Sequence, residues 1–286
     1  MPKKHYPVQR EFRVANNTGV PQLNAKIDVM RNLSQINHRL YRQSRMPEVS
    51  ISIDGSAADG TTVEVYALAD NWWIHKSLQM AKAAWDASNE EEDMMLKGRR
   101  ARWNDFRVSD GLVATGGGGT GFDLLDVVQF DRDTLAAISF TAGEFDLSTV
   151  VDQAGTTKNF SWGAGSAGTY SIMDEYNASG NTDTDPTLPA TGPYSGLLPN
   201  LEAGAAAALQ DQGNNPPYNA NGYGDGYWVK VGVLHLASGR QRLSTGFFKA
   251  PCGLIALTNA SAVVGDISVE VKKGDYKGIH APSMLE

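Results

Sequence analysis

The sequence predicts a mainly β protein, an antiparallel β-sandwich with two inserted or flanking helices and long loops. Segments that alternate apolar with polar residues are rich in Val and Ile, as expected for strands buried on one face. In the last quarter of the chain four such segments follow one another, with Gly, Ser, Asn or Pro in every gap. No helix stands between these four segments, and antiparallel strands need none.

The length of 286 residues fits one large domain or two small ones. We expect a basic N-terminal arm with an amphipathic helix over 1–45, and a sandwich domain over 46–286 with a long loop insertion at about 152–226. The 30 glycines are clustered, which indicates many turns and several loops. Cys252 is the one cysteine, so an intrachain disulfide is impossible. The first residues do not resemble a signal peptide, and no apolar run is long enough to cross a membrane.

The N-terminal segment 1–20 contains Pro2, Pro7 and turn-forming residues, which predict an extended arm. A helix is predicted over 22–45, because apolar residues recur there at three- and four-residue spacing. These apolar residues include Leu23, Ile27, Met30, Leu33 and Leu40. The arginines of this helix fall largely off the apolar stripe, and Pro47 follows its end.

Residues 48–54 alternate strictly and predict a strand, and 61–68 predict its partner in a β-hairpin. A helix is then predicted over 71–92, with Asp70 as its cap. The glycines of 116–121 lack the Gly-Lys-Ser/Thr ending of a phosphate loop and predict a flexible break. Three strands are predicted after it, over 122–130, 135–141 and 145–151.

The long loop over 152–226 holds one predicted strand at 168–173 and one predicted short helix at 201–210. A loop of this length inside a compact domain is usually functional or makes contacts. The four strands of the last quarter are predicted over 227–236, 241–249, 252–258 and 266–272. Their spacing is typical of a sandwich or barrel.

We find no sequence pattern for catalysis, so we expect the protein not to be an enzyme and to have no cofactor. The five histidines show no metal-ligand spacing with one another or with Cys252. Asn181, Asp183 and Asp185 begin like a calcium loop, but the glycine and the glutamate that should follow are missing. We therefore predict no metal, although a cation site between subunits stays open for this loop.

Charge is distributed unevenly along the chain. Residues 1–45 hold nine basic and two acidic residues, which gives a net charge of +7. Because the net charge of the whole chain is −7, the remaining residues carry a net charge of −14. A basic end on an acidic body gives one surface suited to a polyanion and another suited to solvent. The alternative is an ordinary basic helix on an acidic protein.

Three passages resemble a known family. They are YALADNWWIHK at 66–76, STGFFKAPCGLI at 244–255 and GDYKGIHAPSM at 274–284. They resemble jelly-roll capsid (coat) proteins of small environmental viruses with circular single-stranded DNA genomes. The three passages cover about an eighth of the chain and contain no catalytic signature.

The resemblance implies a single jelly roll that self-assembles, in many copies, into an icosahedral shell enclosing a nucleic-acid genome. The protein would be a structural component of the virion, assembled inside the host cell, without membrane contact. Packaged nucleic acid would be bound independently of its sequence. The residues expected to face it are Lys3, Lys4, Arg10, Arg13, Arg31, Arg39, Arg42 and Arg45. Many members of the family begin with a denser arginine and lysine arm, so this chain departs from them in its small reserve of charge.

Two other functions stay open at this point. One is a glycan- or surface-binding β-sandwich module, such as a fibre tip or an adhesin. Its sugar-stacking platform would be Tyr218, Tyr223, Tyr227 and Trp228, which lie in Gly- and Asn-rich sequence. The other is a hydrolase on a jelly-roll scaffold, for which no constellation of residues is apparent.

Overall fold

The structure is a computed structural model. It describes residues 7–14, 24–56, 61–90, 94–95, 101–112, 123–134, 136, 138, 145–163, 165–180, 227–237, 239, 241–258 and 264–286. These residues contain two five-stranded sheets, a three-stranded sheet and three α-helices. None of the described helices is long and apolar enough to span a membrane.

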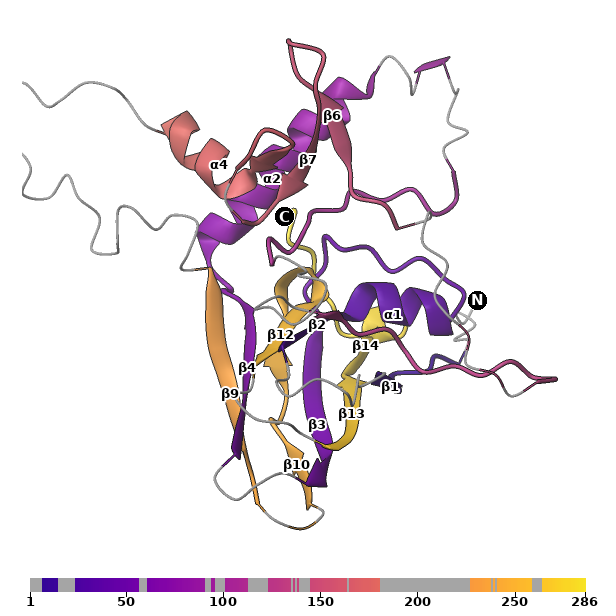
Figure 1. Cartoon of the computed structure of the whole chain (residues 1–286). Coiled ribbons are helices and arrows are strands. Elements are labelled where there is room, and N and C mark those ends of the chain that lie inside the picture. The colour runs from indigo at the N-terminus through magenta and orange to yellow at the C-terminus, as the bar shows by residue number, and fades with distance from the viewer. Residues whose placement is uncertain are drawn as a thin grey trace, which may run out of the picture.

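Two sheets form the body of the molecule (Figure 1). The first sheet has the order β1 (Glu11–Val14), β13 (Val264–Val271), β3 (Glu48–Ser56) and β10 (Gln241–Ser244), and β11 (Phe248–Lys249) also pairs with β3. The second has the order β5 (Asp123–Leu124), β2 (Asn24–Asp28), β12 (Leu254–Thr258), β4 (Thr61–Leu68) and β9 (Trp228–Leu236). All pairs in these two sheets are antiparallel except that of β2 with β5.

The two sheets share one apolar core, which makes them a sandwich. Alternation in the sequence places Val49, Ile51 and Ile53 of β3 on its inner face, and all three are fully buried. Strands of both sheets supply residues to the same cluster, including Val65 of β4 and Val269 of β13. The prediction of a mainly β, antiparallel sandwich is confirmed.

Eight strands of the sandwich pair in a regular way when they are counted along the chain. They are, in order, β1, β2, β3, β4, β9, β10, β12 and β13. The first pairs with the eighth, the second with the seventh, the third with the sixth and the fourth with the fifth. Further pairing of β13 with β3 and of β12 with β4 joins these four pairs into the two sheets.

Apart from β5 and the residues that follow it, the described elements between β4 and β9 form a second layered unit at one end of the sandwich (Figure 1). It contains α2 (Trp72–Ser88), α4 (Ile172–Gly180) and a sheet of β6 (Thr149–Val151), β7 (Thr157–Ser161) and β8 (Thr169–Ser171). These elements enclose their own apolar core, which includes Ile74, Leu78 and Trp162. We call the described residues within 69–112 and 145–227 the insertion, and its core also receives Cys252 and Met284 from the C-terminal part of the chain.

The predicted helix over 22–45 was wrong in its extent. Residues 24–28 form β2, where Ala25 and Ile27 point into the sandwich core, and the helix α1 spans only Val29–Ile36. The apolar spacing fits a helix and a strand over these few residues, and pairing with β12 favours the strand. Asp28 ends β2 and caps α1, because its Oδ1 accepts a hydrogen bond from the Arg31 amide at 2.9 Å.

The predicted hairpin of 48–54 with 61–68 was also wrong, although both strands exist. β3 belongs to the first sheet and β4 to the second, so the chain crosses between the sheets after Ser56. The helix predicted over 71–92 is α2, but its cap is Asn71, whose Oδ1 accepts from the Ile74 amide at 2.9 Å. Asp70 instead accepts hydrogen bonds from Lys249 and His75.

The middle of the chain has less regular strand than predicted. The strand expected over 122–130 is reduced to β5, and that over 145–151 to β6, whereas most of 135–141 and all of 201–210 lie outside the described residues. The strand predicted at 168–173 ends at Ser171, where α4 begins. The strands predicted over 227–236, 252–258 and 266–272 are confirmed as β9, β12 and β13, and 241–249 splits into β10 and β11. The sequence patterns did not predict β1, β2, β7, α4 or β14 (Lys273–Tyr276).

A buried ion pair joins the insertion to the sandwich. Nη1 of Arg107, in the insertion, donates to Oδ2 of Asp28 at 3.2 Å, and the two side chains are 4% and 11% exposed. The guanidinium carbon also lies 4.1 Å from the ring centroid of Phe145. One carboxylate thus uses both oxygens, one to cap α1 and the other to hold Arg107.

We expect Arg107→Ala to lower the free energy of unfolding by about 3–5 kcal/mol, because it leaves a buried carboxylate without its partner. Arg242→Ala is the control, since Arg242 pairs with Glu11 at the surface at 3.8 Å and its removal should change stability little. Chemical denaturation of dissociated subunits measures both. Equal effects of the two variants would contradict the structural role of Arg107.

Candidate nucleic-acid interface

Two segments far apart in the sequence meet to form a basic cluster. One is the irregular segment 37–47, which follows α1, and the other is the turn after β14. Tyr41, fully buried, donates a hydrogen bond from its hydroxyl to the Lys277 carbonyl at 2.9 Å. The Arg42 amide donates to the hydroxyl of Tyr276 at 3.2 Å, so the two segments are joined at two points.

The turn that carries Lys277 has a special backbone. Lys277 and Gly278 both have positive φ angles, of 51° and 93°, and Tyr276 bridges to Ile279 across them. Two consecutive residues of positive φ are typical of a tight type I′ turn, in which glycine is favoured and a lysine is strained. The Lys277 ammonium compensates in part by donating to the Leu40 carbonyl.

Three arginines of the predicted set gather here. Arg39 and Arg42 are exposed, and the half-buried Arg45 places its guanidinium carbon 4.4 Å from the ring centroid of Tyr276. Within the described part of the chain, none of these three forms an ion pair with a carboxylate. We call Arg39, Arg42, Arg45 and Lys277 the arginine cluster.

The arginines of the cluster repel the charged form of Lys277. Burial, and then the positive charges of Arg39 and Arg42, lower the pKa of Lys277 below its usual range, while Asp105 opposes the shift. A bound phosphate would offset these charges. Arginine suits phosphate because its planar fork donates two parallel hydrogen bonds.

Hydrogen bonds to the insertion hold the segment that carries the arginines. The Gln43 amide donates to Oδ2 of Asp105 at 2.9 Å, and its side chain accepts from the Val108 amide at 2.7 Å and donates to the Val108 carbonyl at 3.1 Å. Burial raises the pKa of Asp105, and the nearby charges of Arg107 and Arg42 oppose this shift. The positions of the arginines therefore depend on the same stretch of chain that holds Arg107.

Arg10 lies in a separate basic hollow beside the same turn. Together with Lys273, Asp275 and Gly278 it lines a shallow depression, and its Nη1 donates to the Val271 carbonyl at 3.4 Å. Arg10 and Lys273 form no ion pair among the described residues. The hollow thus extends the basic surface toward β1.

The other predicted residues are not brought into this surface. Arg13 pairs with Asp266 at 2.8 Å and Arg31 with Asp126 at 3.2 Å, so each cation already faces a carboxylate. Lys3 and Lys4 lie outside the described residues. The structure brings together Arg39, Arg42 and Arg45 of the predicted set.

Sequence reasoning missed Lys277, Lys273 and the two tyrosines that organise the arginine cluster. Lys277 stands more than 200 residues from the arginines in the chain, and no charge run marks it. The one local signal is the Lys-Gly dipeptide at 277–278, which is typical of a turn but does not indicate its neighbours.

The structure does not support the other candidate sites predicted from the sequence, among the residues that it describes. Asn181, Asp183 and Asp185 lie outside the described residues, as do Tyr218 and Tyr223. Tyr227 was expected to be exposed in a sugar-stacking platform, but it is buried in the core of the insertion, and Trp228 is half-buried. Among the described residues, no group of three or more His, Cys, Asp or Glu side chains is placed to hold a metal ion.

Comparison with the profiles of known protein families, with curated proteins and with solved structures finds no match to this chain. The functional interpretation of the arginine cluster therefore depends on its own geometry and charge.

Lys277→Asn tests whether the turn takes part in binding, because asparagine tolerates the left-handed backbone while the charge is removed. We expect a plot of log binding constant against log salt concentration, for dissociated subunits and single-stranded oligothymidine, to become shallower by about one unit. Lys230→Asn is the matched control, since Lys230 of β9 pairs with Glu64 of β4 and its removal should not affect the slope. An unchanged slope for Lys277→Asn would exclude this residue from the interface.

Proposed function

We propose that this chain is a viral capsid protein whose body is a single jelly roll. Many copies would self-assemble into a closed icosahedral shell that encloses nucleic acid within the virion. The single observation that supports the proposal most is the pairing of the eight sandwich strands, first with eighth through fourth with fifth. The role would be structural and not enzymatic.

The strand pairing supports a jelly roll in a specific way. A jelly roll distributes eight strands over two sheets through two Greek keys, and a long hairpin folded over on itself produces that arrangement. The four successive pairs found here have the pattern of such a folded hairpin, with the insertion at its closed end, between the fourth and fifth strands. Jelly rolls occur in viral capsids but also in lectins and enzymes, so the fold alone does not decide the function.

The charge distribution favours the capsid among these possibilities. The arginine cluster offers four cations without carboxylate partners among the described residues, on a protein whose net charge is −7. A subunit of a nucleic-acid-filled shell needs one cationic surface and one that repels stray polyanions. Contacts to phosphates would supply binding that is insensitive to base sequence.

Exposed apolar side chains support self-association in many copies. Trp72 at the start of α2 is 70% exposed and Val151 of β6 is 66% exposed. Large apolar side chains are costly to leave in water when they cluster, and neighbouring subunits would cover them. A glycan-binding module receives no comparable support, because Tyr227 of its expected platform is buried.

The packaging role is tested by replacing Arg39, Arg42 and Arg45 with Gln together. We expect intact shells whose protected nucleic-acid content is reduced by at least half, because three cations per subunit no longer neutralise phosphate. Electron microscopy establishes the shells, and nuclease protection followed by quantification of the retained nucleic acid measures the content.

A variant with the same loss of charge elsewhere serves as the control for packaging. Arg102, Lys230 and Arg242 are replaced by Gln, and these shells should package normally. Normal packaging by the first variant, or failed assembly alone, would contradict an inward position of the arginine cluster. Equal losses in both variants would indicate an effect of net charge only.

A further inference from the structure

A hairpin projects from the edge of the sandwich. Val127 bridges to Val14 of β1, and the Val128 amide donates to the Arg13 carbonyl at 2.9 Å. Beyond this base the chain turns back on itself, with hydrogen bonds from Asp131 to the Ala136 carbonyl at 2.8 Å and from Ile138 to the Gln129 carbonyl at 2.9 Å. We call the described residues of this stretch, 128–134, 136 and 138, the hairpin arm, and Figure 1 shows it extending away from the body beside β1.

The tip of the hairpin arm is ordered by its own hydrogen bonds. Oδ1 of Asp131 accepts from the amides of Asp133 and Thr134 and from the Thr134 hydroxyl, at 3.0, 2.8 and 2.9 Å. These bonds, first among them the one from the Thr134 amide, lower the pKa of Asp131. A fixed turn at the tip reduces the entropy that the arm would lose on docking.

The hairpin arm presents apolar side chains to solvent. Phe130 is 60% exposed, Ile138 45% and Val128 39%. Val128 and Phe130 line a hollow together with Phe12 and Ile36 of the body, but more than a third of each exposed side chain remains accessible. An apolar projection of this kind is suited to a hydrophobic hollow on another molecule.

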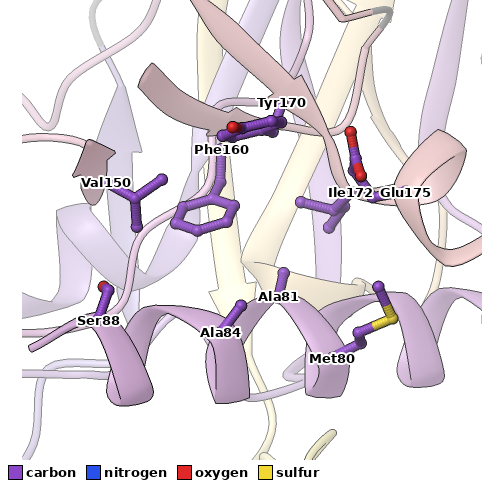
Figure 2. A pocket seen from close by; sticks show the side chains of 9 residues that line it. All are labelled: Met80, Ala81, Ala84, Ser88, Val150, Phe160, Tyr170, Ile172 and Glu175. Atoms are coloured by element: carbon purple, nitrogen blue, oxygen red, sulfur yellow. The ribbon is translucent and has the colours of Figure 1, made fainter. Parts of the chain in front are cut away.

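The insertion contains such a hollow (Figure 2), with a volume of about 310 Å³. Helix α2 forms one wall with Met80, Ala81, Ala84 and Ser88. The opposite wall comes from β6, β7, β8 and α4, through Val150, Phe160, Tyr170, Ile172 and Glu175. We call this hollow the α2 groove, and the small side chains of Ala81 and Ala84 leave room in it for an aromatic ring.

The arm and the groove lie apart on the same molecule. The arm leaves the sandwich beside β1, whereas the groove lies within the insertion, between α2 and the small sheet (Figure 1). The arm therefore does not fill the groove of its own chain. A contact between two different patches is heterologous, so it repeats from copy to copy and builds rings or shells when the rotation closes.

The charges around the two features are complementary. Arg132 at the arm's tip is 93% exposed, and its one ion pair among the described residues is with the adjacent Asp133. Glu175 lines the groove and is exposed. An arm that inserts its apolar residues would bring Arg132 toward this carboxylate.

We propose that the hairpin arm of one copy docks in the α2 groove of a second copy, with Phe130 as its anchor. This inference rests on the proposed function, because it names the contact through which subunits associate. Burying a phenylalanine that is exposed in the free subunit strengthens association by tenfold or more.

Engineered cysteines test the contact directly. Phe130→Cys subunits are mixed with tagged Ala84→Cys subunits and oxidised, and a disulfide between the two chains is expected on a non-reducing gel. The native Cys252 is fully buried and burial raises its pKa, so background cross-linking should be low. Phe247→Cys, at an exposed aromatic of the loop between β10 and β11, is the matched control and should not link to Ala84→Cys.

A second measurement follows assembly itself. Phe130→Ser should raise the protein concentration needed for assembly about tenfold, and Phe247→Ser should change it little. Shells that form without the Phe130–Ala84 cross-link would overturn the arm-in-groove contact and leave the capsid proposal standing. Strictly monomeric protein, without any cross-link, would overturn both proposals. A small apolar molecule bound in the groove of assembled protein, detected by native mass spectrometry, would also overturn the arm-in-groove contact, because the groove would have a different occupant.

Discussion

Among the described residues, the most deeply buried ion pair lies at the junction between the two cores, and the arrangement of the protein depends on it. Asp28 ends the second strand of the sandwich, caps α1 with one oxygen and accepts from Arg107 with the other. Arg107 belongs to the insertion, and the neighbouring Asp105 and Val108 bind Gln43 on the segment after α1. A buried ion pair adds little net stability compared with an apolar contact, but its loss leaves an unpaired charge inside the protein. Together with the Lys26–Asp110 pair at 2.8 Å, this pair holds the insertion on the sandwich.

The same junction positions the arginine cluster. The helix α1 is only eight residues long. The segment that follows it contains Arg39, Arg42 and Arg45 and lies beside the turn after β14, at Lys277 and Gly278. Tyr41 enters the core and binds the Lys277 carbonyl, which holds the two segments together while their cations stay near the surface. Like charges brought this close repel one another, so the fold supplies the attachment that electrostatics opposes. A bound polyanion would attract each of these cations and offset the repulsion among them.

The strands of the sandwich were predictable because one face of each is buried, and burial imposes alternation on residues such as Val49, Ile51 and Ile53. β2 was not predictable, since Ala25 and Ile27 also fit a helical spacing and only pairing with β12 selects the strand. The arginines could be identified from charge, but Lys277 could not, because the turn that places it beside Arg39 is formed by long-range contacts. Local patterns record burial and charge, whereas the site depends on which distant segments meet.

We propose that copies of this chain build a closed shell. Negative-stain or cryo-electron microscopy of the purified wild-type protein, with sedimentation velocity over a range of concentration, salt and pH, tests this most directly. We expect closed particles of uniform diameter, with the basic surface on the inner side. A protein that stays monomeric under all these conditions, or that forms compact trimers only, would contradict the proposal.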